Sequence, residues 1–450
     1  MDRRDFLKTS LAAGGALAFS SCAPGGSSPA GEGTMEMRLN PNSGDRVSLL
    51  GYGCMRWPTT SNLSARESRD EIDQEAVNRL VDYAIEHGVN YFDTAPVYCQ
   101  GRSERVTAAA LLRHPREKYF IATKCSNQNG SKTLKEGQDM FENSLSIFRT
   151  DHIDYYLLHI LSSEQNFKER FLDNGLLDWL MEQRSQGRIR NLGFSFHGER
   201  PGFDAILAWH EKVHWDFVQI QMNYLDWKHS DQASSRPDRK AVNAEYLYGQ
   251  LAAREIPVVI MEPMLGGRLA KLAQGPVTRL KSREPERSAA SWAFRFCGTF
   301  PKVLTILSGM TYMEHLQDNI KSLSGFQPLS EDDLAFLEET ALQILNFPTI
   351  PCTSCQYCMP CPYGLDIPGI FSHYNRCVNE DHIPQDAMSP GYRESRRAYL
   401  ISYARSIPRE RMADHCVGCG ECLMHCPQGI DIPGQMRKID RYAEKLRKNP

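Results

Sequence analysis

The sequence predicts a parallel (β/α)8 barrel of the TIM type, followed by a smaller, mainly helical domain that binds metal through cysteines. Two observations favour the barrel. Strand and helix signals alternate through eight units in about 290 residues, and successive strand-like runs end in polar side chains. The third observation is that eight cysteines fall in 352–361 and 416–426, which favours metal ligation over a disulfide framework. An open doubly wound sheet, the alternative fold, would carry a Gly-rich turn after an early strand, and none is evident.

The composition indicates an ordinary globular protein of more than one domain. The chain has 450 residues, 41% of them apolar, which is ample for a sizeable core. Its 52 basic and 55 acidic residues give a formal charge of −3. Nothing in this balance favours a nucleic-acid partner or a strongly charged membrane-binding surface.

The first 34 residues read as a targeting segment and a linker. Residues 1–22 hold a twin-arginine pattern beginning at Arg3, an apolar stretch Leu11–Phe19, and small residues up to Cys22. No apolar run approaches the roughly 20 residues that span a bilayer. We expect export by the twin-arginine route to the periplasm or cell envelope, against the alternative of a disordered basic start. Cys22, before the Gly/Ser/Pro-rich linker 23–34, resembles the lipidated cysteine of bacterial lipoproteins, although plain cleavage or an uncleaved anchor would also fit.

Residues 35–325 carry the barrel pattern, with each expected strand followed by a helix. A helix over Asp73–His87 is typical of the rest, because its apolar residues recur at helical spacing and Gly88 closes it. The expected strands are Leu49–Gly53, Asn90–Asp93, Tyr119–Lys124, Ile153–His159, Asn191–Ser195, Phe217–Met222, Pro257–Met261 and Val303–Ser308. The other expected helices are Ser103–Arg113, Leu134–Phe148, Leu176–Gln186 and stretches near 203–210, 241–255, 288–296 and 312–322.

Residues 326–350 should form a covering helix, Glu331–Leu345, and a connection punctuated by prolines. Residues 351–450 contain an internal repeat. The nine residues from Cys361, C-P-Y-G-L-D-I-P-G, recur from Cys426 as C-P-Q-G-I-D-I-P-G. In each copy the Asp can cap a helix that has Pro among its first residues. Between the copies, Arg393–Ser406 has helical composition.

Four polar residues follow three successive strands of the predicted barrel: Asp93, Tyr98, Lys124 and His159. Because the carboxyl ends of barrel strands meet at one face, we expect these side chains to converge. A carbonyl accepts hydride only if its oxygen receives a proton or a hydrogen bond, which Tyr98 could supply. Lys124 could favour the phenolate of Tyr98, with Asp93 balancing its charge, and His159 could orient the oxygen. Singly, each residue could be an ordinary packing or ion-pair residue.

With these motifs in view, residues 35–325 resemble the aldo/keto reductase superfamily. The resemblance rests on F-D-T-A-P-V-Y at 92–98, Gly101-Arg-Ser-Glu104, A-T-K at 122–124, Tyr155-Tyr-Leu-Leu-His159, Leu192-Gly-Phe-Ser195 and Asn319. It implies a catalytic tetrad of Asp93, Tyr98, Lys124 and His159, a small carbonyl or alcohol substrate, and NAD(P)H as cofactor. It also implies cofactor contacts from Ser195, Gln219, Gly266, Gly267, Ser308, Gly309 and Asn319, although Gln219 and the two adjacent glycines could equally be strand-end and turn residues.

Three departures from the family pattern bear on the cofactor. Met261-Glu262-Pro263 stands where many members have an aromatic residue that stacks on the nicotinamide. The uncharged run from Ser308 to Thr311 stands where many have a Lys or Arg for a 2′-phosphate, and Phe196 replaces a common amide. The resemblance therefore does not decide between NAD and NADP.

The second cysteine group matches the bacterial ferredoxin run for a [4Fe–4S] cluster: Cys416, Cys419, Cys422 and Cys426-Pro. The first group, Cys352, Cys355, Cys358 and Cys361-Pro, is one residue shorter in its last gap. By resemblance to two-cluster ferredoxins, the fourth Cys of each run serves the other cluster. One cluster would then use Cys352, Cys355, Cys358 and Cys426, and the other Cys416, Cys419, Cys422 and Cys361. Zinc sites and disulfides are the alternatives, although zinc prefers two separate cysteine pairs.

Taken together, the sequence predicts an exported oxidoreductase with an aldo/keto reductase-like barrel and a ferredoxin-like iron–sulfur domain that exchanges electrons with a redox partner. Hydride carries two electrons and a [4Fe–4S] cluster ordinarily passes one, so direct coupling would need a flavin or quinone, for which the sequence shows no motif. The clusters could instead be structural. The rival hypothesis is an exported electron-transfer or binding protein whose barrel is catalytically idle.

Overall fold

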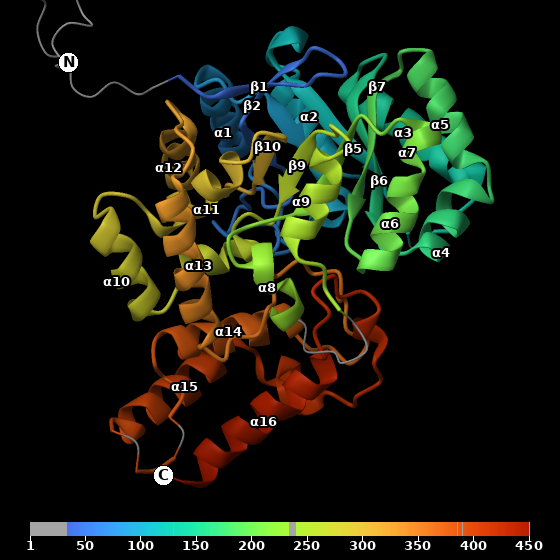
Figure 1. Cartoon of the computed structure of the whole chain (residues 1–450). Coiled ribbons are helices and arrows are strands. Elements are labelled where there is room, and N and C mark those ends of the chain that lie inside the picture. The colour runs from blue at the N-terminus through green and yellow to red at the C-terminus, as the bar shows by residue number, and fades with distance from the viewer. Residues whose placement is uncertain (1–33, 129, 234–239, 385, 389, 450) are drawn as a thin grey trace, which may run out of the picture. The chain divides into compact units, whose positions relative to one another are not determined.

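The computed structural model describes residues 34–128, 130–233, 240–384, 386–388 and 390–449. These residues form one compact unit (Figure 1). The expected targeting segment 1–22 and nearly all of the linker 23–34 lie outside the described residues. In the part of the chain that is described, no helix combines the length and apolar character needed to cross a bilayer.

Eight parallel strands close into a barrel, which confirms the predicted fold class over an open sheet. Around the barrel the order is β10-β3-β4-β5-β6-β7-β8-β9, so each strand pairs with its sequence neighbour and the last strand pairs with the first. The strands are β3 (Leu50–Gly53), β4 (Tyr91–Asp93), β5 (Phe120–Cys125), β6 (Ile153–Leu161), β7 (Ile189–Phe196), β8 (Phe217–Gln221), β9 (Val258–Met261) and β10 (Val303–Ser308).

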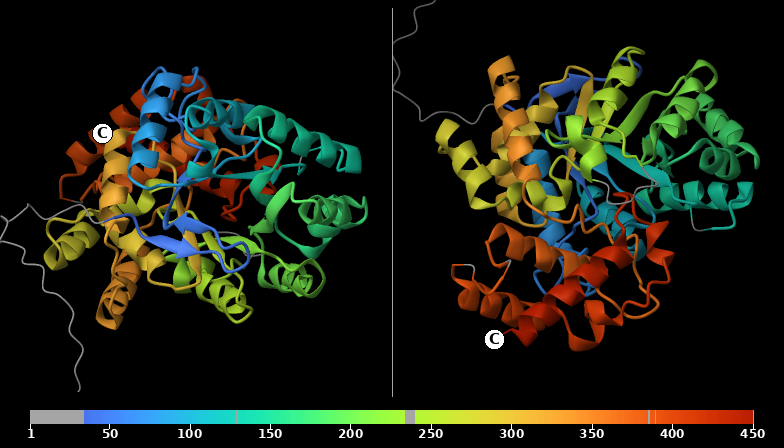
Figure 2. Two further views of the ribbon diagram at one scale, coloured as in Figure 1. Left: turned by 90° about the horizontal axis from the view of Figure 1, so that it is seen from above. Right: turned by 60° about the horizontal axis from the view of Figure 1, so that its bottom comes forward.

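A short hairpin that the sequence pattern did not predict closes the N-terminal end of the barrel. It consists of β1 (Met37–Leu39) and β2 (Arg46–Ser48), which pair antiparallel (Figure 2). Val47 packs into the barrel interior with Tyr91 and Tyr155, and Asn40 donates a hydrogen bond to the Tyr155 hydroxyl at 3.2 Å. The opposite, carboxyl-terminal end is thus the face available for a site.

Helices surround the barrel at the predicted places. Asp73 caps the first helix by accepting from the Ala76 amide, and Gly88 follows it with a φ of 86°, as the helix-end signals predicted. Short helices α4, α7, α8 and α10 and the π-helical turn η3 (Lys168–Leu172) are additions to the prediction. The barrel helices are α1 (Gln74–Glu86), α2 (Ser103–Leu111), α3 (Leu134–Phe148), α4 (Glu164–Phe167), α5 (Leu176–Ser185), α6 (Arg200–Ala208), α7 (His210–Val213), α8 (Asp226–Ala233), α9 (Ala244–Ala252), α10 (Gln274–Arg283), α11 (Ala289–Gly298) and α12 (Met313–Leu323).

The C-terminal part is helical and has a core of its own. Helix α13 (Glu331–Leu345) begins with a capping box between Ser330 and Asp333, and packs against α10. Helices α14 (Ile367–Asn379), α15 (Tyr392–Ser406) and α16 (Ile432–Lys448) bury a separate apolar cluster (orange to red in Figure 1).

The two copies of the repeat start α14 and α16 in the same way. Asp366 accepts a hydrogen bond from the Gly369 amide at 3.1 Å, and Asp431 accepts from the Gly434 amide at 3.1 Å. Each helix has Pro in its first turn, where the missing N–H costs no helical hydrogen bond. The repeat therefore delivers its cysteine at the same distance before each helix.

Loops from this C-terminal part contact the loops at the carboxyl-terminal end of the barrel. Arg56, after β3, donates to the Thr353 carbonyl at 3.0 Å, and Arg66 donates to the Ser354 carbonyl at 2.9 Å. On another side of the barrel, the side-chain amide of Gln428 donates to that of Gln221 at 2.9 Å. The first cysteine loop therefore lies over the end of the barrel where the predicted polar residues meet.

Candidate active site

The structure pairs Asp93 with Lys124 at the ends of adjacent strands. Asp93 is the last residue of β4 and Lys124 lies near the end of β5, and both side chains are buried. The Lys124 ammonium donates to Asp93 Oδ2 at 2.6 Å and to the Thr94 carbonyl at 2.9 Å. Burial lowers the pKa of Lys124, and the Asp93 carboxylate opposes that shift. Each charge is therefore compensated by the other inside the barrel.

Tyr98 lies beside this ion pair, in the short turn η1 (Tyr98–Gly101) that follows β4. The Lys124 ammonium is 5.2 Å from the centre of the Tyr98 ring. The pKa of Tyr98 is raised well above its usual value, by burial first and then by Tyr357 and Asp93. Lys124 was expected to lower this pKa, but the lowering contribution comes from Arg66, and burial outweighs it. Tyr98 consequently keeps the proton that a proton donor must supply.

His159, near the end of β6, completes the group. Its ring meets the Tyr98 ring edge to face, with centroids 5.7 Å apart. Burial, followed by the neighbouring charge of Lys124, lowers its pKa well below the usual value, so the ring stays neutral. Ser126 Oγ lies 2.6 Å from Nδ1; when this hydroxyl donates, the ring hydrogen is on Nε2, which can donate to a substrate oxygen.

Arg170, on the π-helical turn η3, supports the backbone at His159 and was not predicted. It is fully buried and donates to the carbonyl of His159 at 2.6 Å and to that of Ile160 at 3.1 Å. Ile160 has a φ of 55°, and its amide donates to Ser195 Oγ at 2.8 Å. The arginine thus satisfies carbonyl groups where the strand leaves regular geometry. No local sequence pattern marks a residue that acts through a turn of this kind.

A cavity of about 630 Å³ opens at this end of the barrel. It is lined by Asp93, Tyr98 and His159 and by all seven predicted cofactor-binding residues, whereas Lys124 lies outside the lining and reaches it through Asp93 and the Tyr98 ring. The cofactor-binding residues predicted from the resemblance are Ser195, Gln219, Gly266, Gly267, Ser308, Gly309 and Asn319. The structure therefore brings the two sets together in one cavity.

The chemistry of this lining fits a nicotinamide cofactor. Gln219 Oε1 is buried and, among the described residues, has no hydrogen-bond partner, which leaves it available to a carboxamide N–H. Asn319 donates to Ser308 Oγ at 2.9 Å at the other end of the cavity. Gly267 has a φ of 98° in the turn η4 (Leu265–Ala270) and an open space at its missing Cβ.

Gly266 and Gly309 are more crowded than the resemblance implied. A Cβ on Gly266 would lie 2.3 Å from the Thr353 carbonyl oxygen, so this glycine permits close contact with the first cysteine loop. A Cβ on Gly309 would lie 2.8 Å from Arg56 Cδ. Glu262, which stands where many family members have an aromatic residue, is a buried carboxyl whose pKa is raised by burial and lowered by Arg56.

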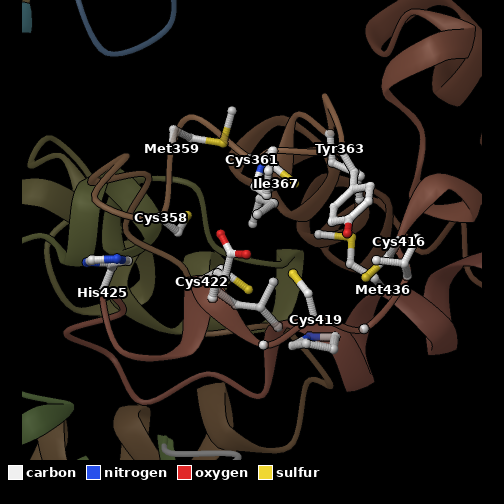
Figure 3. A pocket seen from close by; sticks show the side chains of 18 of the residues that line it. Cys358, Met359, Cys361, Tyr363, Ile367, Cys416, Cys419, Cys422, His425 and Met436 are labelled. Atoms are coloured by element: carbon white, nitrogen blue, oxygen red, sulfur yellow. The ribbon is translucent and has the colours of Figure 1, made fainter.

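The eight clustered cysteines lie around two further cavities. Cys352, Cys355, Cys358 and Cys426 line a cavity of about 20 Å³. Cys361, Cys416, Cys419 and Cys422 line one of about 210 Å³, which Cys358 also borders (Figure 3). These are the two sets that the ferredoxin resemblance implied, including the exchange of the fourth ligand.

The donor chemistry of each set fits a [4Fe–4S] cluster, which takes four cysteine thiolates. In the described residues, no three His, Cys, Asp or Glu side chains lie close enough to hold a single metal ion. Burial, followed by the proximity of Cys355 and Cys426, raises the pKa of Cys352 to about 12. The pKa of Cys422 is raised to about 11, first by burial and then by the proximity of Cys416, Cys419 and Cys361. A bound cation would reverse these shifts.

Comparison with known proteins divides the chain in the same way. The model of the aldo/keto reductase family matches residues 49–341, that of a 4Fe-4S dicluster domain matches 351–430, and that of the twin-arginine translocation signal matches 1–20. An uncharacterized oxidoreductase of Bacillus subtilis, YqkF, is 23% identical over 66% of this chain and 94% of its own. An NADH-specific methylglyoxal reductase of Escherichia coli is 29% identical over 35% of this chain and 51% of its own. The silkworm (Bombyx mori) aldo-keto reductase AKR2E5, solved with NADPH, matches with a TM-score of 0.52 and 19% identity, over 69% of this chain and 88% of its own.

Proposed function

Because the chain belongs to the aldo/keto reductase family, we propose that it reduces a small carbonyl compound, or oxidises the corresponding alcohol, with NAD(P)H at the mouth of its barrel. The observation that carries the proposal is the convergence of Asp93, Lys124, Tyr98 and His159 at one end of the barrel. Three of them line the same cavity as the residues that fit the cofactor. An idle barrel would have no reason to keep a buried ion pair beside a protonated phenol.

The cofactor, when bound, supplies hydride to the carbonyl carbon. The chain would hold its carboxamide through Gln219 and Ser195, and its phosphate and adenosine ends through Gly267, Ser308 and Asn319. The lining includes both acidic and basic residues near β10, so NAD and NADP remain equal candidates. The relatives differ in the same respect, since one is described as NADH-specific and one was solved with NADPH.

The chain's own residues would manage the carbonyl oxygen. Tyr98 gives it a proton, so that one carbonyl, one hydride and one proton become one alcohol. His159 donates a hydrogen bond that positions the oxygen and stabilises the charge that develops on it. Lys124 compensates the phenolate left on Tyr98, and Asp93 fixes the position of Lys124 through the 2.6 Å contact.

We further propose that the two cysteine sets hold two [4Fe–4S] clusters, which when bound would exchange single electrons with a redox partner. Cys355 lines both the barrel cavity and the first cysteine cavity, and Cys358 lines both cysteine cavities. Around the second set, Cys419 is exposed, as are the apolar side chains of Val417 and Met424. The first set thus adjoins the barrel site, and the second adjoins a surface that a partner could reach.

The match to a twin-arginine signal indicates export by that route, which carries folded proteins. We propose that the protein works in the periplasm or cell envelope, and that Cys22 is the point of lipid attachment. Labelling with a radioactive fatty acid would separate lipidation from plain cleavage, because only a lipidated protein retains the label.

The experiment that tests the barrel chemistry compares Tyr98→Phe with the parent protein, both purified without oxygen. Loss of the proton donor should lower kcat for carbonyl reduction by about 10² to 10⁴, while the binding of NADH or NADPH, followed by nucleotide fluorescence, stays the same. Tyr91→Phe is the matched control, because the Tyr91 hydroxyl is buried in the barrel interior without a partner among the described residues. Retained turnover in Tyr98→Phe would contradict the proposed role. Failure of the parent to bind either nucleotide would favour the exported electron-transfer protein with an idle barrel.

A further inference from the structure

The first cysteine loop forms part of the wall of the barrel cavity. Cys355 and Tyr357 line this cavity together with Tyr98 and His159. The proposed reaction centre is therefore bounded by two parts of the chain that lie in different domains of the sequence. Tyr357 brings a second phenol to a site in which the family pattern supplied only one.

The loop is fixed to the barrel on both sides of its backbone. Arg56 holds the Thr353 carbonyl and Arg66, which is only 6% exposed, holds the Ser354 carbonyl. Thr353 also lies directly against Gly266, where any larger residue would collide with its backbone. The guanidinium groups of buried Arg66 and half-buried Arg56, together with a close backbone contact, hold the position of the loop more firmly than a surface loop is usually held.

Tyr357 has a conformation set by its neighbours in the loop. Ser354 and Gln356 both have left-handed backbones, with φ of 54° and 61°, a conformation that costs energy outside glycine. Cys355 and Cys358, two residues of the first cysteine set, stand on either side of Tyr357 in the sequence. Ligation of both cysteines would therefore fix the short segment that carries the phenol.

The hydroxyl groups of Tyr98 and Tyr357 have free hydrogen-bonding capacity. Among the described residues neither hydroxyl has a hydrogen-bond partner, although both side chains line the cavity. Both hydroxyl groups can therefore donate a hydrogen bond to a molecule that binds in the cavity.

We propose that Tyr357 is a second substrate-contacting residue of this site, whose hydroxyl donates a hydrogen bond to an oxygen on the carbon next to the carbonyl that Tyr98 protonates. The substrate class that uses both phenols is a carbonyl compound with a neighbouring oxygen, such as an α-dicarbonyl or an α-hydroxycarbonyl. This inference rests on the proposed function of the barrel. It gives the cysteine domain a direct part in substrate recognition, separate from any exchange of electrons.

The test compares two carbonyls that differ in the neighbouring oxygen, methylglyoxal and propanal, with the full-length protein under anaerobic conditions. Tyr357→Phe should lower kcat/KM for methylglyoxal about tenfold, the worth of one hydrogen bond to a substrate, and leave that for propanal unchanged. Tyr98→Phe should abolish the reduction of both compounds. Tyr363→Phe is the matched control, because Tyr363 belongs to the same domain but is 48% exposed and lines the second cysteine cavity.

The electron paramagnetic resonance spectrum of the reduced protein should be the same in Tyr357→Phe and the parent, which shows that the cysteine loop is intact. An equal loss for both carbonyls, or no loss for methylglyoxal, would overturn the role given to Tyr357. If the parent reduces neither compound, the proposed function fails for these substrates. The hydrogen bond from Tyr357 is then tested by calorimetry, which measures the affinity of the parent and of Tyr357→Phe for each carbonyl. Only a selective loss of affinity for methylglyoxal in the variant supports the hydrogen bond, and any other result overturns it.

Discussion

The barrel and the cysteine domain hold their reactive side chains by different means. In the barrel, Asp93, Lys124 and His159 project from strands whose backbones are paired on both sides. In the cysteine domain the candidate ligands stand on loops, and left-handed residues such as Ser354, Gln356, Gly418 and Gly420 interrupt any regular structure. The barrel site is therefore preorganised by the polypeptide alone, whereas the cysteine loops lack a regular backbone framework of their own. This difference predicts that the two regions respond differently to the same disturbance.

Removal of iron gives the largest expected difference. Chelation under oxidising conditions should disorder the loops 351–366 and 416–430 and loosen helices α14 to α16, because these loops have no regular backbone pairing and cluster ligation would hold them in place. The backbone amides of the barrel strands should stay protected from hydrogen exchange. Hydrogen exchange followed by mass spectrometry measures both regions in one experiment.

A cysteine outside the two sets provides the control for this experiment. Cys297 is buried in the barrel, where its thiol contacts the Met222 carbonyl at 3.3 Å. Cys297→Ala should cost about 1 kcal/mol of stability and leave iron content unchanged, whereas Cys358→Ala should reproduce the effect of chelation. If residues 351–430 kept full protection from hydrogen exchange without iron, the cysteine domain would be as preorganised as the barrel. That result would contradict the proposed difference between the two regions.

Breaking the buried ion pair is the corresponding disturbance in the barrel. Lys124→Met leaves Asp93 buried without its partner, which should lower the free energy of unfolding by about 3–5 kcal/mol. Adding Asp93→Asn should recover part of that stability without restoring carbonyl reduction, because the charge that compensates Tyr98 is still missing. Urea unfolding followed by tryptophan fluorescence gives the stabilities.

The exposed pair Lys135–Asp139 on α3 is the control, with both side chains more than half exposed. Lys135→Met should change the stability by about 0.5 kcal/mol or less. A loss of that small size in Lys124→Met would show that the barrel pair is not the organising contact of the site.

The sequence predicted those parts of the molecule that depend on local pattern. Strand periodicity placed Asp93 and Lys124 at adjacent strand ends, and the repeated Asp-Ile-Pro-Gly predicted the caps at Asp366 and Asp431, which the structure confirms. The spacing of cysteines, through resemblance, grouped Cys361 with the later run. Each of these inferences needs only neighbouring residues or a known arrangement of strands.

The contacts between barrel and cysteine domain could not be predicted in that way. Arg56 and Thr353 are 297 residues apart, and Arg66 and Ser354 are 288 apart. No periodicity relates an arginine in one loop to a carbonyl in another, because the contact depends on how two finished regions pack. For the same reason no sequence pattern marked Tyr357. Gly266 was expected to contact the cofactor, and its close contact with Thr353 was not foreseen.

Two histidines should give the barrel and the cysteine domain opposite dependences of stability on pH, an effect smaller than those above. His152, in the barrel, lies 3.5 Å from the Asp154 carboxylate and is hydrogen-bonded to Asp151, and these two carboxylates raise its pKa. The charged form of His152 therefore stabilises the fold fully at a pH below the pKa of an unfolded histidine. This contribution is lost as the pH rises through the higher pKa that His152 has in the folded protein. His152→Gln should weaken the barrel most at mildly acid pH.

His373 in the cysteine domain should act with the opposite sign. It lies on α14 between Tyr399 and Tyr403 of α15, its Nε2 is 2.8 Å from Ser402 Oγ, and Cys377 is 3.5 Å away. Burial, with a contribution from Arg376, lowers its pKa to about 4. Between that value and about 6.5, the unfolded chain binds a proton that the folded chain does not, so stability falls as the pH drops through this window.

The effect of His373 should approach about 2 kcal/mol between about pH 7 and about pH 5, since each pKa unit corresponds to about 1.4 kcal/mol. His373→Gln cannot take up a proton, so the acid-induced loss of stability should shrink by that amount in the variant relative to the parent. Urea unfolding of the iron-loaded protein at the two pH values, followed by circular dichroism, measures the difference. An unchanged pH dependence in His373→Gln would mean that His373 is solvated in the folded domain. The helical core would then be looser than the contacts of His373 with Tyr399 and Tyr403 indicate.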